Sequence, residues 1–159
     1  NPQRPGDIDL LWKHVNVRKE DRLLLLAWIL ECFRRDTPDP LLELTGEHGS
    51  GKSLTHKYIH SLIDPNRVNL RSAPQKIEDL LVPASHSLLV SIENASNLSA
   101  IMQDRLCTLS TGGGFAVRSL YTTNEETVIE LQRPVIINSI SPVVSRPDLL
   151  DRTFMLDLP

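Results

Sequence analysis

The sequence is poor in the features that mark several classes of protein. Its two cysteines, Cys32 and Cys107, both lie in apolar helical contexts, which predicts buried reduced thiols rather than a disulfide framework. The longest apolar run, residues 23–30, falls far short of the roughly 20 residues that a membrane span needs. No signal peptide is visible. These absences predict a cytoplasmic protein that makes no contact with a membrane.

Basic charge is also in short supply. The chain carries 17 lysines and arginines against 20 aspartates and glutamates, for a formal net charge of −3. A domain that binds nucleic acid by itself normally carries a basic patch. Any contact with DNA must therefore be local, or come from other parts of the protein. Because the sequence starts at Asn1 and ends directly after a strand-like run, we expect an excised domain.

The length of 159 residues suits one α/β domain and not two. We expect residues 1–15 to form a tail or linker and residues 16–159 to form the core domain. Asn16 is a plausible N-cap for a helix that reaches about residue 35. The centre of that helix, LLLLAWIL, is apolar all round, which predicts burial on more than one side.

The most informative stretch is residues 41–63. An apolar run at 41–44 predicts a strand, and a later helix is expected to bury an apolar face made of Leu54, Tyr58, Ile59, Leu62 and Ile63. Between them lies a full match to G-x-x-x-x-G-K-[ST], in the strand–loop–helix context that this pattern requires. The match comprises Gly46, Glu47, His48, Gly49, Ser50, Gly51, Lys52 and Ser53, and Leu54 follows it.

These residue types suit the binding of a nucleoside triphosphate. Gly46 and Gly51 allow backbone conformations with positive φ, which turn N–H groups toward an anion. The helix that begins near Lys52 adds the positive end of its dipole. We expect Lys52 to reach the outer phosphates and the Ser53 hydroxyl to be a ligand of Mg²⁺.

Two further buried strands end in polar residues. The strand expected at 87–92 ends at Glu93, and the strand at 135–137 ends at Asn138. Because ligands gather at the carboxyl ends of parallel strands, we interpret Glu93 as an acid that binds Mg²⁺ directly or through water. The alternative is a strand-end cap that faces solvent. The Asn138 amide suits a hydrogen bond to a γ-phosphate or the attacking water, and equally a cap on the next helix.

Residues 115–131 predict a β-hairpin before the third strand. After that strand, Arg146 and Arg152 lie on a polar segment, where they suit the stabilisation of transition-state charge across a subunit boundary. The alternative is surface pairing with Asp148 and Asp151.

The pair His56 and His60 has the i, i+4 spacing of some metal sites. No third ligand is evident, and the intervening residues lack the glutamate of a zinc-protease helix. We therefore expect both histidines to be solvated helix residues.

The order of these parts resembles the AAA+ and superfamily 3 helicase branch of P-loop ATPases. From about residue 15 to the end, the blocks GEHGSGKS, STGGGFAVRSLYTTNEE, QRPVIINSI and SRPDLLDR resemble ATP-binding domains of primase-helicase-like proteins of phages and bacterial mobile elements. The resemblance implies an α/β fold, the three-layer P-loop NTPase sandwich. Its central sheet is mostly parallel, with the hairpin inserted before the third core strand.

The resemblance also implies an ATPase that assembles as a ring, often a hexamer, with ATP and Mg²⁺ between subunits. By this likeness Lys52, Ser53 and Glu93 bind phosphate and metal, and Asn138 is the sensor. Arg146 or Arg152 acts as the finger in a neighbour's site. The hairpin is the insert that faces the pore, where it would meet single-stranded DNA.

Several residues depart from the family pattern. Relatives usually carry Asp in place of Glu93, and many carry a second acid in place of Asn94. Asn can bind a water but cannot accept its proton, so hydrolysis is expected to be slow or to be assisted by Glu47, itself otherwise a solvated loop residue. We also expect the AAA+ lid domain, which would follow Pro159, to be absent from this domain.

The hairpin departs from the pattern as well. Its tip holds Glu125 and Glu126, and Arg118 is its only strong cation. Two functions therefore stay open. The first is the ATPase motor of a DNA-replication helicase or primase-helicase. The second is a nucleotide-binding switch or scaffold with weak or no hydrolysis.

Overall fold

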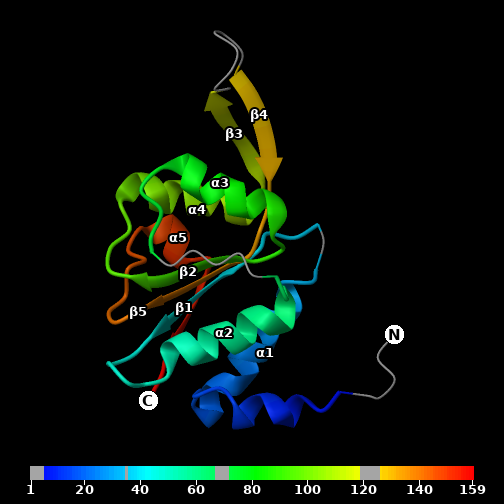
Figure 1. Cartoon of the computed structure of the whole chain (residues 1–159), viewed down its shortest axis with the longest axis vertical. Coiled ribbons are helices and arrows are strands. Elements are labelled where there is room, and N and C mark those ends of the chain that lie inside the picture. The colour runs from blue at the N-terminus through cyan, green and yellow to red at the C-terminus, as the bar shows by residue number, and fades with distance from the viewer. Residues whose placement is uncertain (1–5, 35, 67–71, 119–125) are drawn as a thin grey trace.

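A parallel sheet forms the centre of the computed structural model, which describes residues 6–34, 36–66, 72–118 and 126–159 (Figure 1). The strand order is β2-β5-β1-β6, and all three strand pairings are parallel. The strands are β1 (Leu41–Thr45), β2 (Val90–Ala95), β5 (Val135–Ser139) and β6 (Thr153–Asp157). Their carboxyl ends therefore meet at one edge of the sheet.

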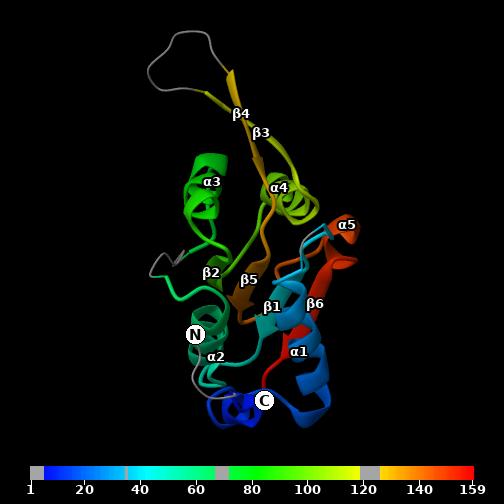
Figure 2. The ribbon, with the colours of Figure 1, turned by 90° about the vertical axis from the view of Figure 1, so that its right-hand side faces the viewer.

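Helices cover both faces of this sheet (Figure 2). Side chains alternate along β1: Leu42 and Leu44 pack against α1 (Arg22–Glu31) and α2 (Lys52–Ile63). Leu41 packs on the opposite face, which is covered by α3 (Ile77–His86), α4 (Ala100–Thr111) and α5 (Pro147–Leu150). This period of two in strands that are buried on both faces produces a three-layer α/β sandwich, as the sequence predicted.

The expected hairpin is present. Strands β3 (Gly113–Arg118) and β4 (Glu126–Leu131) pair antiparallel between α4 and β5, and they extend away from the main sheet (Figure 1). Phe115 is buried at the base of the hairpin, opposite Ile129. The tip, residues 119–125, lies outside the described residues, and so does the expected acidic residue Glu125.

The first helix differs from the prediction. Two 3-10 helices (Ile8–Lys13 and Lys19–Asp21) precede α1, which begins at Arg22, so Asn16 is not its N-cap. One face of α1 is buried, whereas Leu23 and Leu30 are 77% and 67% exposed. The expected burial on more than one side is therefore wrong, because α1 lies in an outer layer and packs against the sheet on one side.

The start of the core domain stays a prediction. Val15 belongs to the core cluster, and Leu11 and Trp12 pack against it from the 3-10 helix.

Across the described part of the chain, no helix is both long and apolar enough to span a membrane.

Trp28 tests how far α1 contributes to stability. Its side chain is fully buried, and its Nε1–H donates to the Pro40 carbonyl (3.0 Å). We expect Trp28→Ala to lower the free energy of unfolding by about 3–5 kcal/mol in denaturant titrations. The exposed Leu23→Ala on the same helix should change it by less than about 0.5 kcal/mol. Equal effects would contradict the one-sided packing of α1.

Candidate nucleotide-binding site

The loop between β1 and α2 turns sharply at its glycines. Gly46, Gly49 and Gly51 have φ values of 149°, 91° and 78°. A Cβ on Gly46 would lie 2.7 Å from Ser50 Oγ and 2.9 Å from the Leu158 carbonyl oxygen, so a side chain has no room there. The backbone at Gly46 thus packs directly against Ser50 of the same loop and against Leu158, which follows the end of β6.

The first N–H groups of α2 are open to a ligand. Gly51 precedes the helix in the left-handed conformation, and no side chain caps it. Glu47, His48, Ser53 and Leu54 are exposed around this end of the helix. Uncapped N–H groups and the helix dipole together favour an anion at this position.

Lys52 folds back over the loop. Its ammonium group donates to the carbonyls of Gly46 (2.7 Å) and Glu47 (2.6 Å), with Ser50 Oγ at 3.4 Å. All three acceptors are neutral, and among the described residues no carboxylate forms an ion pair with Lys52. The loop therefore holds a positive charge with no acidic partner.

The polar strand ends lie at the same edge of the sheet. Glu93 is half-buried near the end of β2, and Asn94 is exposed with a φ of 53° where the pairing of β2 with β5 shifts register. Asn138 is buried and lies one residue before Ser139, the last residue of β5. The metal roles of Ser53 and Glu93 stay predictions.

A chain of hydrogen bonds joins this edge to α2. The backbone N–H of Asn94 donates to Asn138 Oδ1 (2.6 Å), and Asn138 Nδ2 lies 3.0 Å from His56 Nδ1. His56 Nε2 lies 2.5 Å from Ser91 Oγ. His56 and Asn138 are both 0% exposed. We call the Asn94 N–H and the side chains of Asn138, His56 and Ser91 the polar chain.

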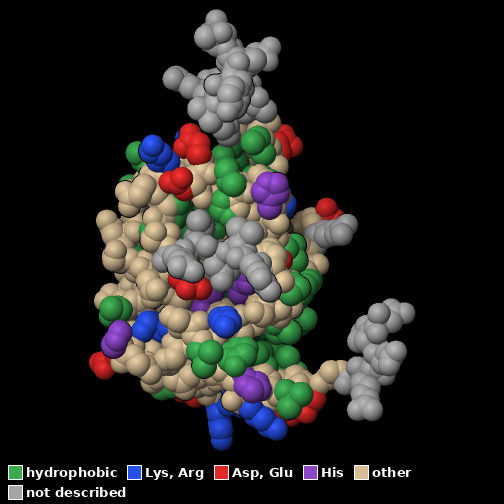
Figure 3. Space-filling model, viewed as in Figure 1, with side chains coloured by type: hydrophobic (Ala, Val, Ile, Leu, Met, Phe, Trp, Pro, Cys, Tyr) green, Lys and Arg blue, Asp and Glu red, His purple; other side chains and the backbone are tan. Residues whose placement is uncertain are grey.

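The predicted apolar face of α2 is confirmed for Ile59 and Ile63 and wrong for its other members. The buried face holds Ile59 and Ile63 with His56 and His60, so neither histidine is solvated. The apolar residues Leu54, Tyr58 and Leu62 are exposed instead, and hydrophobic side chains are visible at the surface over α2 (Figure 3). The spacing of Ile59 and Ile63 would have found His56, which lies three residues before Ile59 on the same face.

The partners of His56 define its protonation. The Asn94 N–H can only donate, so Asn138 presents its oxygen there and its NH₂ group to His56. His56 Nδ1 therefore accepts, and its Nε2–H donates to Ser91. Burial lowers the pKa of His56 to about 3 and also lowers that of His60. The ring of His56 is neutral at physiological pH.

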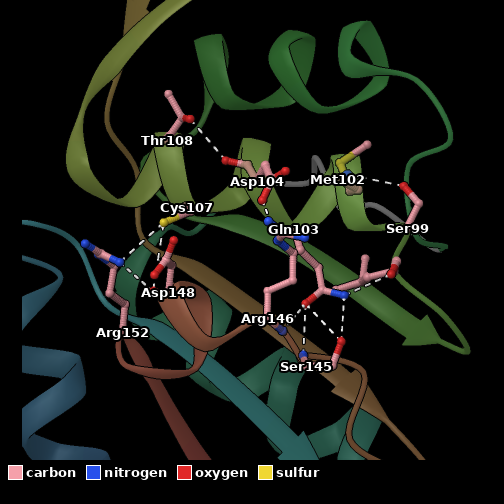
Figure 4. Close-up of polar contacts among 11 residues, drawn as sticks. Ser99, Met102, Gln103, Asp104, Cys107, Thr108, Ser145, Arg146, Asp148 and Arg152 are labelled. Carbon is pink, nitrogen blue, oxygen red and sulfur yellow. Dashed lines mark hydrogen bonds and ion pairs between the residues drawn. The ribbon is translucent and has the colours of Figure 1, made fainter.

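Arg146 and Arg152 lie away from the phosphate loop, the segment between β1 and α2. Arg146 precedes α5 and Arg152 follows it, on either side of a cavity of about 250 Å³ between α4 and α5 (Figure 4). Arg152 directly precedes β6, whose other end contacts Gly46. The structure thus brings neither arginine to the Lys52 of its own chain.

Neither arginine has the expected acidic partner. Arg146 pairs with Asp104 (Nε to Oδ1, 2.6 Å) rather than with Asp148 or Asp151. Arg152 donates to the carbonyl oxygen of Asp148 (2.5 Å), and its Nη1 lies 3.4 Å from Cys107 Sγ. Pairing with the nearest carboxylates in sequence is therefore wrong, because α4 packs beside α5 and supplies Asp104 to Arg146 and Cys107 to Arg152.

A buried glutamine that the sequence analysis missed holds the segment before α5. Gln103 Oε1 accepts from the backbone N–H groups of Ser145 and Arg146, both at 2.9 Å (Figure 4). Its amide nitrogen donates to the Leu98 carbonyl (3.0 Å). The start of the arginine segment is thereby fixed to α4.

The parallel sheet, the glycine loop and the helix that follows it define a P-loop NTPase fold. The chain belongs to the actinomycete integrative conjugative element replication protein family, whose model matches residues 8–159. No curated protein matches the chain.

Solved structures show the same fold. The apo C-terminal region of NrS-1 aligns with a TM-score of 0.63 and 15% identity over 94% of this chain and 36% of that one. Two structures of the JCV helicase, one with a bound acetamide compound, give TM-scores of 0.58 and 0.56 at 14% and 16% identity. These cover 93% and 94% of this chain, which spans 44% and 42% of theirs.

The protonation of His56 predicts how stability depends on pH. The unfolded histidine takes up a proton below a pKa of about 6.5, whereas the folded one does so only near 3. Stability should therefore fall as the pH drops through this window. Relative to His56→Asn, wild type should lose about 2 kcal/mol of its unfolding free energy between pH 7 and pH 5 in denaturant titrations. A difference that stays constant would contradict the neutral buried ring.

Proposed function

We propose that this domain binds ATP with Mg²⁺ and hydrolyses it as the motor of a replication helicase or primase-helicase. The observation that carries the proposal is the Lys52 ammonium, held against neutral oxygens in a glycine loop at the uncapped start of α2. A triphosphate would supply the negative charge that this arrangement lacks. The replication-protein family supports the biological setting.

Each residue has a role in this proposal. The N–H groups of residues 46–54 and the Lys52 ammonium bind the phosphates, and Ser53 and Glu93 hold Mg²⁺. The metal ion, when bound, neutralises charge that develops on the phosphate oxygens. The half-buried position of Glu93 at the carboxyl edge fits an oxygen ligand of this kind. Asn138 orients the attacking water or the γ-phosphate.

The arginines serve a neighbouring subunit in this proposal. Arg152 directly precedes the amino end of β6, at the opposite end of this strand from the loop, so it would not complete the site of its own chain. A ring of subunits, such as a hexamer, would place one of the two arginines beside the next nucleotide. Hairpin 115–131 would then face single-stranded DNA in the pore.

One observation favours the second function, a nucleotide-binding switch with weak or no hydrolysis. The residue after Glu93 is Asn94, which cannot accept a proton from water at neutral pH. The two functions differ in turnover and in its response to DNA, so one experiment separates them.

The test is ATP turnover by the full-length protein with and without single-stranded DNA. We expect turnover to be stimulated by DNA and to fall at least 100-fold in Lys52→Ala, since removal of one charged donor costs about 10²–10³ in rate. Lys57→Ala, an exposed lysine on the same helix, is the control and should keep wild-type turnover.

The remaining outcomes are distinct. ATP binding by calorimetry with negligible turnover, unaffected by DNA, would establish the switch. If neither wild type nor Lys52→Ala binds ATP, both functions are wrong.

A shared site makes a further prediction about mixed subunits. Lys52→Ala and Arg152→Ala should each be inactive alone, and mixing them should restore part of the turnover. An intact site then forms from the loop of one variant and the arginine of the other. The same mixing with Arg146→Ala identifies which arginine acts. No recovery with either arginine variant would show that the arginines do not act across a boundary.

A further inference from the structure

We infer that His56 is a positioning residue for ATP turnover, which acts by holding the Asn138 amide in one orientation between α2 and the end of β2. This inference rests on the proposed function. It concerns a residue that lies one helical turn after Lys52 and does not belong to the phosphate-loop pattern.

The Asn138 amide uses only part of its hydrogen-bonding capacity within the protein. Its oxygen accepts from the Asn94 N–H, and one amide hydrogen goes to His56 Nδ1. Among the described residues, no acceptor takes the second amide hydrogen. That hydrogen is the group with which Asn138 would bind a phosphate oxygen or a water.

The contact with His56 fixes the direction of the second amide hydrogen of Asn138. An amide held only through its oxygen can swing about that contact, whereas two contacts fix its plane. His56 is itself fixed, because its Nε2–H donates to Ser91 on β2 and the ring is 0% exposed. The orientation of the amide is therefore set from two strands and one helix.

The same chain of hydrogen bonds connects the end of β2, which carries Glu93, to helix α2. Asn94 adjoins Glu93 and adopts a φ of 53° at the register shift of β2. Its N–H bond to Asn138 and the bond from Asn138 to His56 run without a break from this turn to α2. A displacement of α2 at the phosphates would reach Glu93 through this route.

The loop itself does not depend on His56. The Lys52 contacts, the glycine conformations and the uncapped N–H groups of α2 involve other atoms. Removing the imidazole should therefore lower kcat while the Kd for ATP stays within about threefold. Loss of a residue that orients a site residue typically costs about 10- to 100-fold in activity.

His60→Leu provides the matched control. His60 lies one turn further along α2 and is 3% exposed, but its Nε2 contacts no partner among the described residues. His56→Leu and His60→Leu both replace a buried imidazole by an apolar side chain. Only His56→Leu removes a contact to Asn138, so only it should lose turnover.

The experiment measures kcat and the Kd for ATP in the full-length protein for His56→Leu, His60→Leu and His56→Asn. Asn places its Oδ1 as many bonds from Cβ as His places Nδ1, so His56→Asn should recover at least part of the lost turnover. If His56→Leu does not fold, the comparison of His56→Asn with His60→Leu carries the test.

A second measurement separates positioning from packing. In an Asn138→Ala background, His56→Leu should change kcat by less than about threefold, because residues that act as a unit are not additive. Equal kcat in His56→Leu and His60→Leu, or an undiminished loss in the Asn138→Ala background, would overturn the inference. If wild type has no Lys52-dependent turnover, the proposed function fails and this inference fails with it.

Discussion

The phosphate loop is the segment of six residues, 46–51, that connects the buried strand β1 to helix α2. The rest of the site depends on how tightly this loop is packed. Gly46 contacts Ser50 and the end of β6 so closely that no Cβ fits. Asn16 adds to the packing, since its Nδ2 donates to the carbonyls of Ser50 and Pro159, both at 2.8 Å. Segments from both ends of the described chain thus hold the loop.

The polar groups beneath this turn are paired while remaining uncharged. Ser91, His56 and Asn138 satisfy one another in the core, where a charged group without a partner would be costly. On the other face of the sheet, Glu43 accepts from the Val143 N–H (2.6 Å), and burial raises the pKa of its carboxyl group. Among the described residues, the Lys52 ammonium contacts only neutral acceptors, so no carboxylate there competes with a ligand for it.

The sequence predicted the strands and the hairpin because their signals are local. Runs such as Leu41–Thr45 are rich in apolar residues and buried over their whole length, and the glycine loop follows a pattern that few other structures produce. The faces of α2 could not be predicted this way. Its inner face carries histidines whose partners, Asn138 and Ser91, come from strands far away in the sequence, whereas apolar Leu54, Tyr58 and Leu62 remain exposed. Likewise, only tertiary packing brings Asp104 to Arg146.

The parallel sheet separates the loop that follows β1 from Arg152, which precedes β6. The loop follows the carboxyl end of β1, whereas Arg152 precedes the amino end of β6, and the two strands run side by side in register from Leu41 opposite Thr153. Five residues of strand span about 16 Å, so these groups lie at opposite edges of one sheet. For the proposed reaction, Arg152 would therefore act on a nucleotide bound to another copy of the chain. Gln103, which fixes the start of the arginine segment to α4, would hold that surface in place before the copies meet.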